Sequence, residues 1–261
     1  MNYKAYFLIF KNNLYISLSY RWNIISGILL MILQIMVSLF VWLTIFDTTS
    51  NVKNYTVTDM ISYFLLSALV GVTFSSSHIF RLTRMVRTGQ LNMVLIRPYS
   101  FLLDSFSNFI GSKMIEFGTT ILLAVTLYSV GLTTWHGISL LELLLLLTNF
   151  TLLFIFGSFL GSLSFWLIQM WPLKSLYNSM MAIFGGALYP LDLLPDKWAQ
   201  LITLTPFPLF GYVNIRLLQG ELHYNETLYY LILSVIWLII FSIGYKILWV
   251  KGLKKYEGVN A

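Results

Sequence analysis

The chain has 261 residues, of which 58% are hydrophobic and only 10% are charged. A soluble domain carries about a quarter charged residues, so this composition predicts an integral membrane protein, and the formal charge of +6 reports membrane topology rather than nucleic-acid binding. The absence of cysteine excludes disulfides, thiolate metal sites and thiol nucleophiles.

Apolar runs predict an all-α integral membrane protein with six transmembrane helices and both termini in the cytoplasm. Residues 1–22, which include Lys4 and Lys11, are expected to form an amphipathic interfacial helix. The spans are expected at 24–46, 60–80, 105–133, 140–169, 175–189 and 228–250. This topology places only Lys53, Lys197 and Arg216 of the 16 lysines and arginines outside, as the positive-inside rule requires.

Small residues at four-residue spacing predict helix packing in two spans. Ser67, Gly71 and Ser75 form such a stripe in the second span, and Gly157 and Gly161 form a GxxxG pair in the fourth. The partner of the GxxxG face is either another helix of this chain or a second protein.

Few polar residues lie inside the spans. Lys113 and Glu116, three residues apart, share a helix face, and we interpret them as a mutually neutralised pair near the inner headgroups in preference to a transport role. If the chain is a transporter, Gln34, Asn178 and the abundant aromatic residues are candidate substrate contacts, although aromatic residues in membrane proteins more often serve packing.

A basic segment at 81–98 lies between the second and third spans. Leu82, Met85 and Val86 fall on one side of a short predicted helix, and Arg81 and Arg84 fall on the other. Gly89 loosens this helix, and Pro98 prevents its continuation beyond Arg97. The segment is expected at the cytoplasmic surface, either as a loop that only sets topology or as the contact for a cytoplasmic partner.

The fifth apolar run is too short for an ordinary span. Residues 175–189 cover roughly 23 Å at ~1.5 Å per residue, less than the ~30 Å hydrocarbon core. Backbone-breaking residues follow, and we predict a half-span and a re-entrant outer hairpin at 190–212, buried in protein or lining a cavity. The backbone-breaking residues of this half-span and hairpin are Gly185, Gly186, Pro190, Pro195 and Pro206.

Sequence motifs for chemistry are missing. The chain has no phosphate-binding GxxxxGK[ST] loop, no GxGxxG and no HExxH, so we expect no cofactor, metal site or catalytic residue. A non-transporting immunity or scaffold protein is the main alternative to a transporter. An intramembrane enzyme, which would use His136, His223 or Glu142, is a weaker one.

In the order and spacing of its motifs, essentially the whole chain resembles the permease subunits of ABC-2 type exporters, in particular the compact bacterial branch with six spans. The resembling residues are Tyr20, Arg21, Trp22, Asn23, Gly89, Gln90, Leu91, Leu95, Ile96, Arg97, Pro98, Gly185, Gly186, Tyr189, Pro190, Leu191, Leu194, Pro195, Thr205, Pro206, Phe207 and Gly220.

The resemblance implies a division of labour. Segment 81–98 would contain the coupling helix, which docks into a separate ATPase subunit through Arg81, Arg84, Met85, Arg87, Gly89, Leu91 and Arg97. Two ATPase subunits would bind ATP and Mg²⁺, and a second permease copy or paralogue would complete a dimer in the cytoplasmic membrane. The dimer would export an amphiphilic drug, peptide or lipid-like substrate between the first, second and fifth spans, with no nucleic-acid partner.

Overall fold

The computed structural model describes residues 3–19, 21–48, 53, 55–75, 78–97, 100–129, 131, 137–167 and 169–256. Tyr20, Pro98 and His136, which entered the sequence predictions, lie outside these residues. The described part is helical: α1 (Tyr3–Ser19), α2 (Arg21–Thr48), α3 (Val57–Thr73), α4 (Ile79–Arg87), α5 (Gln90–Leu95), α6 (Phe101–Ser129), α7 (Leu140–Ser162), η1 (Leu163–Phe165), α8 (Trp171–Phe184), η2 (Leu191–Leu193), α9 (Asp196–Thr203), α10 (Phe207–Phe210), α11 (Tyr212–Gln219) and α12 (Tyr224–Lys255).

Within the described residues, four helical stretches are long and apolar enough to cross a membrane. They are Ile25–Thr48, Phe101–Thr126, Leu140–Phe165 and Tyr224–Lys255. Helix α3 is apolar but only 17 residues long, and α8 has 14 residues. At ~1.5 Å per residue these two helices extend roughly 25 Å and 21 Å, so each needs flanking residues to cross a ~30 Å core.

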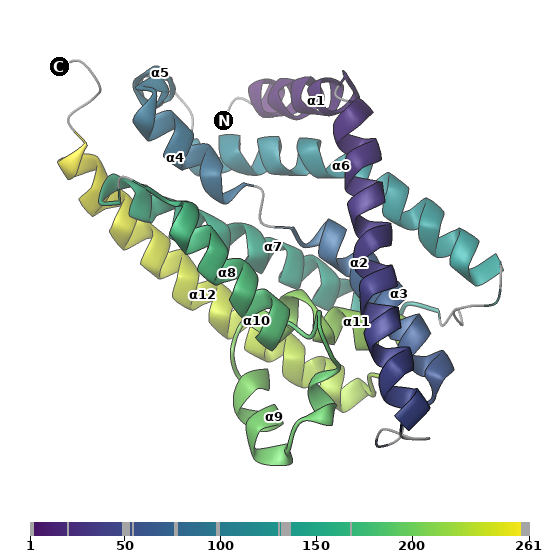
Figure 1. Cartoon of the computed structure of the whole chain (residues 1–261). Helices are drawn as coiled ribbons and strands as arrows, with labels where there is room; N and C mark the ends of the chain where they lie inside the picture. The colour runs from purple at the N-terminus through teal and green to yellow at the C-terminus, as the bar shows by residue number, and fades with distance from the viewer. Residues whose placement is uncertain are drawn as a thin grey trace.

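The helices form a tilted bundle with two distinct ends (Figure 1). Helices α7 and α12 pack along each other, α2 packs on α3, and α1 lies alongside the first half of α6. Helix α1, the α4–α5 segment and the C-terminal end of α12 lie at one end, and α9 lies at the other. The basic segment and the proline-rich segment therefore occupy opposite ends of the molecule.

The core between these ends is strongly aromatic. Phe154 contacts Phe106 and Phe109 at centroid distances of 5.0 and 5.5 Å, and Phe156 contacts Phe210 and Phe241 at 5.7 and 4.6 Å. Such pairs contribute about 0.5–1.5 kcal/mol beyond the area that they bury. They hold α6, α10 and α12 against α7.

Some helix ends differ from the sequence expectation. The predicted second span ran to Phe80, but α3 ends at Thr73 and α4 starts at Ile79. Helix α8, the predicted fifth span, starts at Trp171 instead of Ser175. Pro172 is tolerated in its first turn, because the N–H that proline lacks would have no helical partner there. The helix ends at Phe184, so the irregular backbone begins at Gly185, earlier than the predicted Pro190.

Candidate coupling surface and membrane path

The basic segment folds as two short helices joined at Gly89. Helix α4 ends at Arg87, and Gly89 has a φ of 71°, a left-handed conformation that glycine adopts without the strain of a side chain. Helix α5 then runs from Gln90 to Leu95. The glycine lets the chain change direction between the two helices, as the sequence predicted.

The inner side of this segment is anchored in a small apolar cluster. Leu82 and Leu91 are buried with Phe165 of η1, and Trp249 and Leu253 of α12 pack against them. Met85 is partly buried on the same side. The segment is therefore held against the bundle by an apolar face that joins α4, α5, η1 and α12.

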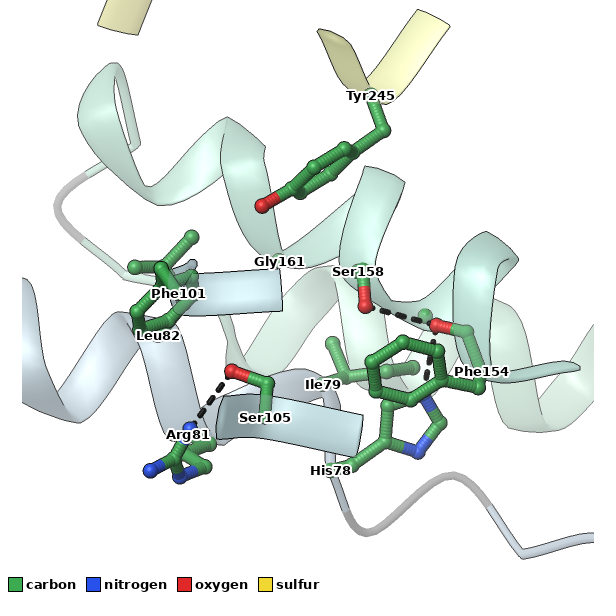
Figure 2. Close-up of a pocket in the computed structure, with 11 residues that line it drawn as sticks. His78, Ile79, Arg81, Leu82, Phe101, Ser105, Phe154, Ser158, Gly161 and Tyr245 are labelled. Atoms are coloured by element: carbon green, nitrogen blue, oxygen red, sulfur yellow. Dashed lines mark hydrogen bonds between the residues drawn. The ribbon is translucent and has the colours of Figure 1, made fainter. Parts of the chain in front are cut away.

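Arg81 belongs to this anchored side and not to the exposed basic face. Its guanidinium donates to Asp104 Oδ2 and to Ser105 Oγ, each at 2.6 Å, and its side chain is only 16% exposed. The contact with Ser105 is visible in Figure 2. We call this group of Arg81, Asp104 and Ser105 the inner clamp, because it fixes α4 to the first turns of α6.

The outer side of the segment combines cations with exposed apolar side chains. Arg84 and Arg87 are exposed on α4. Met93 is 66% exposed and Ile96 is 85% exposed. We did not predict from the sequence that Met93 and Ile96 would be exposed. The available signal was their three-residue spacing, which places two apolar side chains on one side of a helix. Arg97, also exposed, follows Ile96. We call Arg84, Arg87, Met93 and Ile96 the coupling surface.

The GxxxG pair packs within the chain, against the start of α4. A Cβ on Gly157 would lie 2.1 Å from His78 Nε2, and one on Gly161 would lie 3.0 Å from the Ile79 carbonyl oxygen. His78, Gly157 and Gly161 also line a small pocket with Arg81 and Tyr245 (Figure 2). The two glycines thus seat α4 on α7.

The small-residue stripe of the second span does not act as one packing face. Ser67 is buried, but a Cβ on Gly71 would meet no atom within 4 Å. Ser75 lies beyond the end of α3 and accepts a hydrogen bond from Lys113. Only part of the predicted stripe is therefore covered by the described residues of this chain.

Lys113 pairs with Glu116, as the sequence suggested, but it also reaches α3. Its ammonium donates to Glu116, to Ser75 Oγ and, at 2.9 Å, to the Val72 carbonyl oxygen. The lysine side chain is fully buried, whereas that of Glu116 is 37% exposed. A buried cation at a helix C-terminus satisfies carbonyls that lack helical partners, which explains why α3 can end inside the predicted span.

The two candidate path residues, Gln34 and Asn178, are both exposed in the single chain. Asn178 belongs to a polar face of α8 that it shares with Ser175 and Ser179. The exposed face of α12 differs, because it carries isoleucines such as Ile239 and Ile243. Lipid contact suits the face of α12, whereas the polar face of α8 requires water or protein as its neighbour.

The opposite end of the molecule holds the irregular backbone after α8. Tyr63 Oη donates to the Gly186 carbonyl oxygen at 2.6 Å, and the Tyr212 N–H donates to that of Gly185 at 2.8 Å. A Cβ on Gly211 would lie 2.1 Å from the Gly185 oxygen. These contacts satisfy backbone groups that a broken helix leaves free.

Two further side chains fix the segment that follows. Lys53 donates to the carbonyl oxygens of Asp192 and Leu194, and Tyr55 donates to Asp192 Oδ2 at 2.7 Å. Burial, followed by this hydrogen bond, raises the pKa of Tyr55 well above its ordinary value. Tyr55 therefore remains a neutral donor. Pro190, Pro195 and Pro206 directly precede η2, α9 and α10, respectively.

No group of three or more histidine, aspartate or glutamate side chains within the described residues could hold a metal ion.

The long apolar helices define a multi-pass membrane protein. The family model of ABC-2 family transporter proteins matches residues 31–259, and the chain therefore belongs to this family. Members are transport components rather than enzymes, and permeases of this kind generally work with ABC ATPase subunits. No curated protein matches the chain.

Proposed function

We propose that this chain is the permease subunit of an ATP-driven exporter in the cytoplasmic membrane. The observation that carries the proposal is the coupling surface, in which Arg84, Arg87, Met93 and Ile96 are exposed while the other side of the same segment is anchored in the bundle. A soluble partner can bind such a surface, because exposed apolar side chains supply buried area and the flanking cations supply specificity.

The partner that we propose is a pair of ABC ATPase subunits, which would bind ATP and Mg²⁺ themselves. Family membership supports this assignment, and so does the absence of any phosphate-binding loop in the sequence. ATP-driven closure of the ATPases would move the coupling surface. The path through the membrane would then close on one side of the membrane and open on the other.

The proposed path lies between two permease chains, identical or closely related. The polar face of α8, with Ser175, Asn178 and Ser179, supports this arrangement because lipid is a poor neighbour for it. An amphiphilic drug, peptide or lipid-like molecule fits a path that also borders the apolar exposed face of α2.

The proposed topology has six crossings, with α1 and both termini in the cytoplasm and residues 190–212 as a re-entrant hairpin outside. The position of α1, α5 and the end of α12 at one end of the bundle, with α9 at the other, supports it (Figure 1). The distribution of lysine and arginine in the sequence supports the same orientation.

Mass spectrometry of the tagged chain, extracted from its native membrane in mild detergent, tests the proposal. We expect an ATP-binding subunit in a near one-to-one ratio, and any second permease in the sample would distinguish a heterodimer from a homodimer. Isolation of the chain alone in several detergents would contradict the exporter assignment and favour a stand-alone membrane protein.

A further inference from the structure

Helix α3 makes polar contacts with two distant parts of the chain. At its C-terminal end, Lys113 of α6 donates to the Val72 carbonyl oxygen and to Ser75 Oγ. Near the middle of the helix, Tyr63 donates to the Gly186 carbonyl oxygen. Helix α3 therefore connects α6 with the backbone break that follows α8.

The Lys113 contact is fully satisfied. An ammonium group has three donors, and the three acceptors are Val72, Ser75 and Glu116. The side chain is completely buried. An ionisable side chain at membrane depth is costly and is therefore a candidate for a functional role. Its geometry at the end of α3 defines that role as positioning.

Helix α6 also holds the basic segment at 81–98. The inner clamp joins Arg81 of α4 to Asp104 and Ser105 of α6, with both distances at 2.6 Å. Asp104 and Lys113 are separated by about 13 Å of helix at ~1.5 Å per residue. One helix therefore carries the attachment of α4 and the attachment of α3.

The contact between Tyr63 of α3 and Gly186 is closely packed. Gly186 has a φ of 79°, and a Cβ at this position would lie 2.8 Å from Tyr63 Oη and from Tyr212 Cβ. The Tyr63 hydroxyl therefore fits tightly against the backbone where the proposed outer hairpin begins. A shift of α3 along its axis would displace this part of the backbone.

We propose that Lys113 is the positioning residue that transmits movement of α4 to the outer hairpin, through α6 and α3. The order of contacts is Arg81 to Asp104, Lys113 to Val72 and Ser75, and Tyr63 to Gly186. This proposal rests on the proposed function in one respect only, namely that an ATPase is the partner that moves α4. A contiguous network does not by itself demonstrate coupling, so the test measures coupling directly.

The test is a double-mutant cycle in the full chain, purified into lipid nanodiscs without any ATPase. The sequence contains no cysteine, so Ala187→Cys, at a half-buried position next to Gly186, introduces a single thiol. Asp104→Asn weakens the inner clamp. We expect it to raise the rate of maleimide labelling of this thiol by about fivefold or more, within the range of allosteric couplings.

The cycle then repeats Asp104→Asn in the Lys113→Met background, where we expect less than about a twofold change in the labelling rate. Lys113→Arg keeps a charged donor and should restore the response. Thr120→Val is the matched control, because Thr120 makes a neutral polar contact with Thr73 of α3 at 3.3 Å. This variant should retain the full response to Asp104→Asn.

The proposal is overturned if Asp104→Asn leaves the labelling rate unchanged, or changes it equally with and without Lys113. If Lys113→Met does not fold, Ser75→Ala takes its place, since it removes one Lys113 acceptor and leaves the ion pair with Glu116 intact. It should reduce the response to Asp104→Asn, and an undiminished response overturns the proposal. Because no ATPase is present, failure of this cycle is distinct from failure of the exporter assignment.

Discussion

Replacement of Asn149 by leucine should strongly destabilise the bundle, because Asn149 is the centre of a buried polar group. Its Nδ2 donates to Asn214 Oδ1 at 2.8 Å, and its Oδ1 accepts from Ser234 Oγ at 2.6 Å. All three residues have no exposed surface. The group ties α11 to α7 and α12, so it fixes α11 within the bundle.

The magnitude follows from the two lost hydrogen bonds. Inside membranes such bonds contribute about 0.6 kcal/mol on average and up to ~1.7 kcal/mol. Leucine would also leave Asn214 Oδ1 unpaired, at a cost of about 1–3 kcal/mol, whereas Ser234 keeps its bond to the Tyr230 carbonyl oxygen. We therefore expect Asn149→Leu to lower the free energy of unfolding by about 2–4 kcal/mol.

The assay is reversible unfolding in mixed micelles with increasing fractions of denaturing detergent. Ser234→Ala should cost about 1 kcal/mol, and adding it to Asn149→Leu should cost much less, because the bond between the two residues is already lost. A free energy of unfolding for Asn149→Leu within about 0.5 kcal/mol of the unmodified chain would refute the reasoning.

Two other predictions follow from contacts of single residues. Gly157→Val should lower the free energy of unfolding by about 1–3 kcal/mol in the same assay, because the new side chain would push His78 away. Gly71→Val is the control, since a side chain there meets open space, and it should cost less than about 0.5 kcal/mol. Equal costs would show that α4 is not seated on Gly157. Tyr55→Phe removes a hydrogen-bond donor to the Asp192 carboxylate. It should speed proteolysis between η2 and α9 by about tenfold, which is equivalent to ~1.4 kcal/mol. An unchanged rate would show that this bond does not hold the segment.

Local features of the basic segment at 81–98 were predictable from the sequence. The break at Gly89 follows from the conformational freedom of glycine, and the anchored positions of Leu82 and Met85 follow from helical spacing. The position of Arg81 did not follow, because its partner Asp104 is 23 residues away along the chain. Helical spacing alone grouped Arg81 with Arg84.

The end of the second apolar helix shows a different limit. The predicted span ran to Phe80 across the polar residues at 75–78, whereas α3 ends at Thr73. The polar stretch was therefore a signal for this end that the predicted span passed over. The pairing of Lys113 with Glu116 was visible at three-residue spacing, but the contact of Lys113 with Val72 depends on tertiary structure. Likewise, Gly157 and Gly161 predicted close packing without identifying α4 as the partner.

We propose that the coupling surface binds an ATPase. The most direct measurement is the amount of ATP-binding subunit that co-purifies with Arg84→Glu/Arg87→Glu, relative to the unmodified chain. The matched control is Lys254→Glu/Lys255→Glu, which reverses two exposed cations at the same end of the bundle. Both double variants change the net charge equally.

We expect the arginine reversal to reduce the co-purified ATPase at least about tenfold, equivalent to ~1.4 kcal/mol of binding free energy, while its unfolding in micelles stays unchanged. The lysine reversal should retain most of the ATPase. Undiminished ATPase binding by Arg84→Glu/Arg87→Glu would contradict the assignment of the coupling surface.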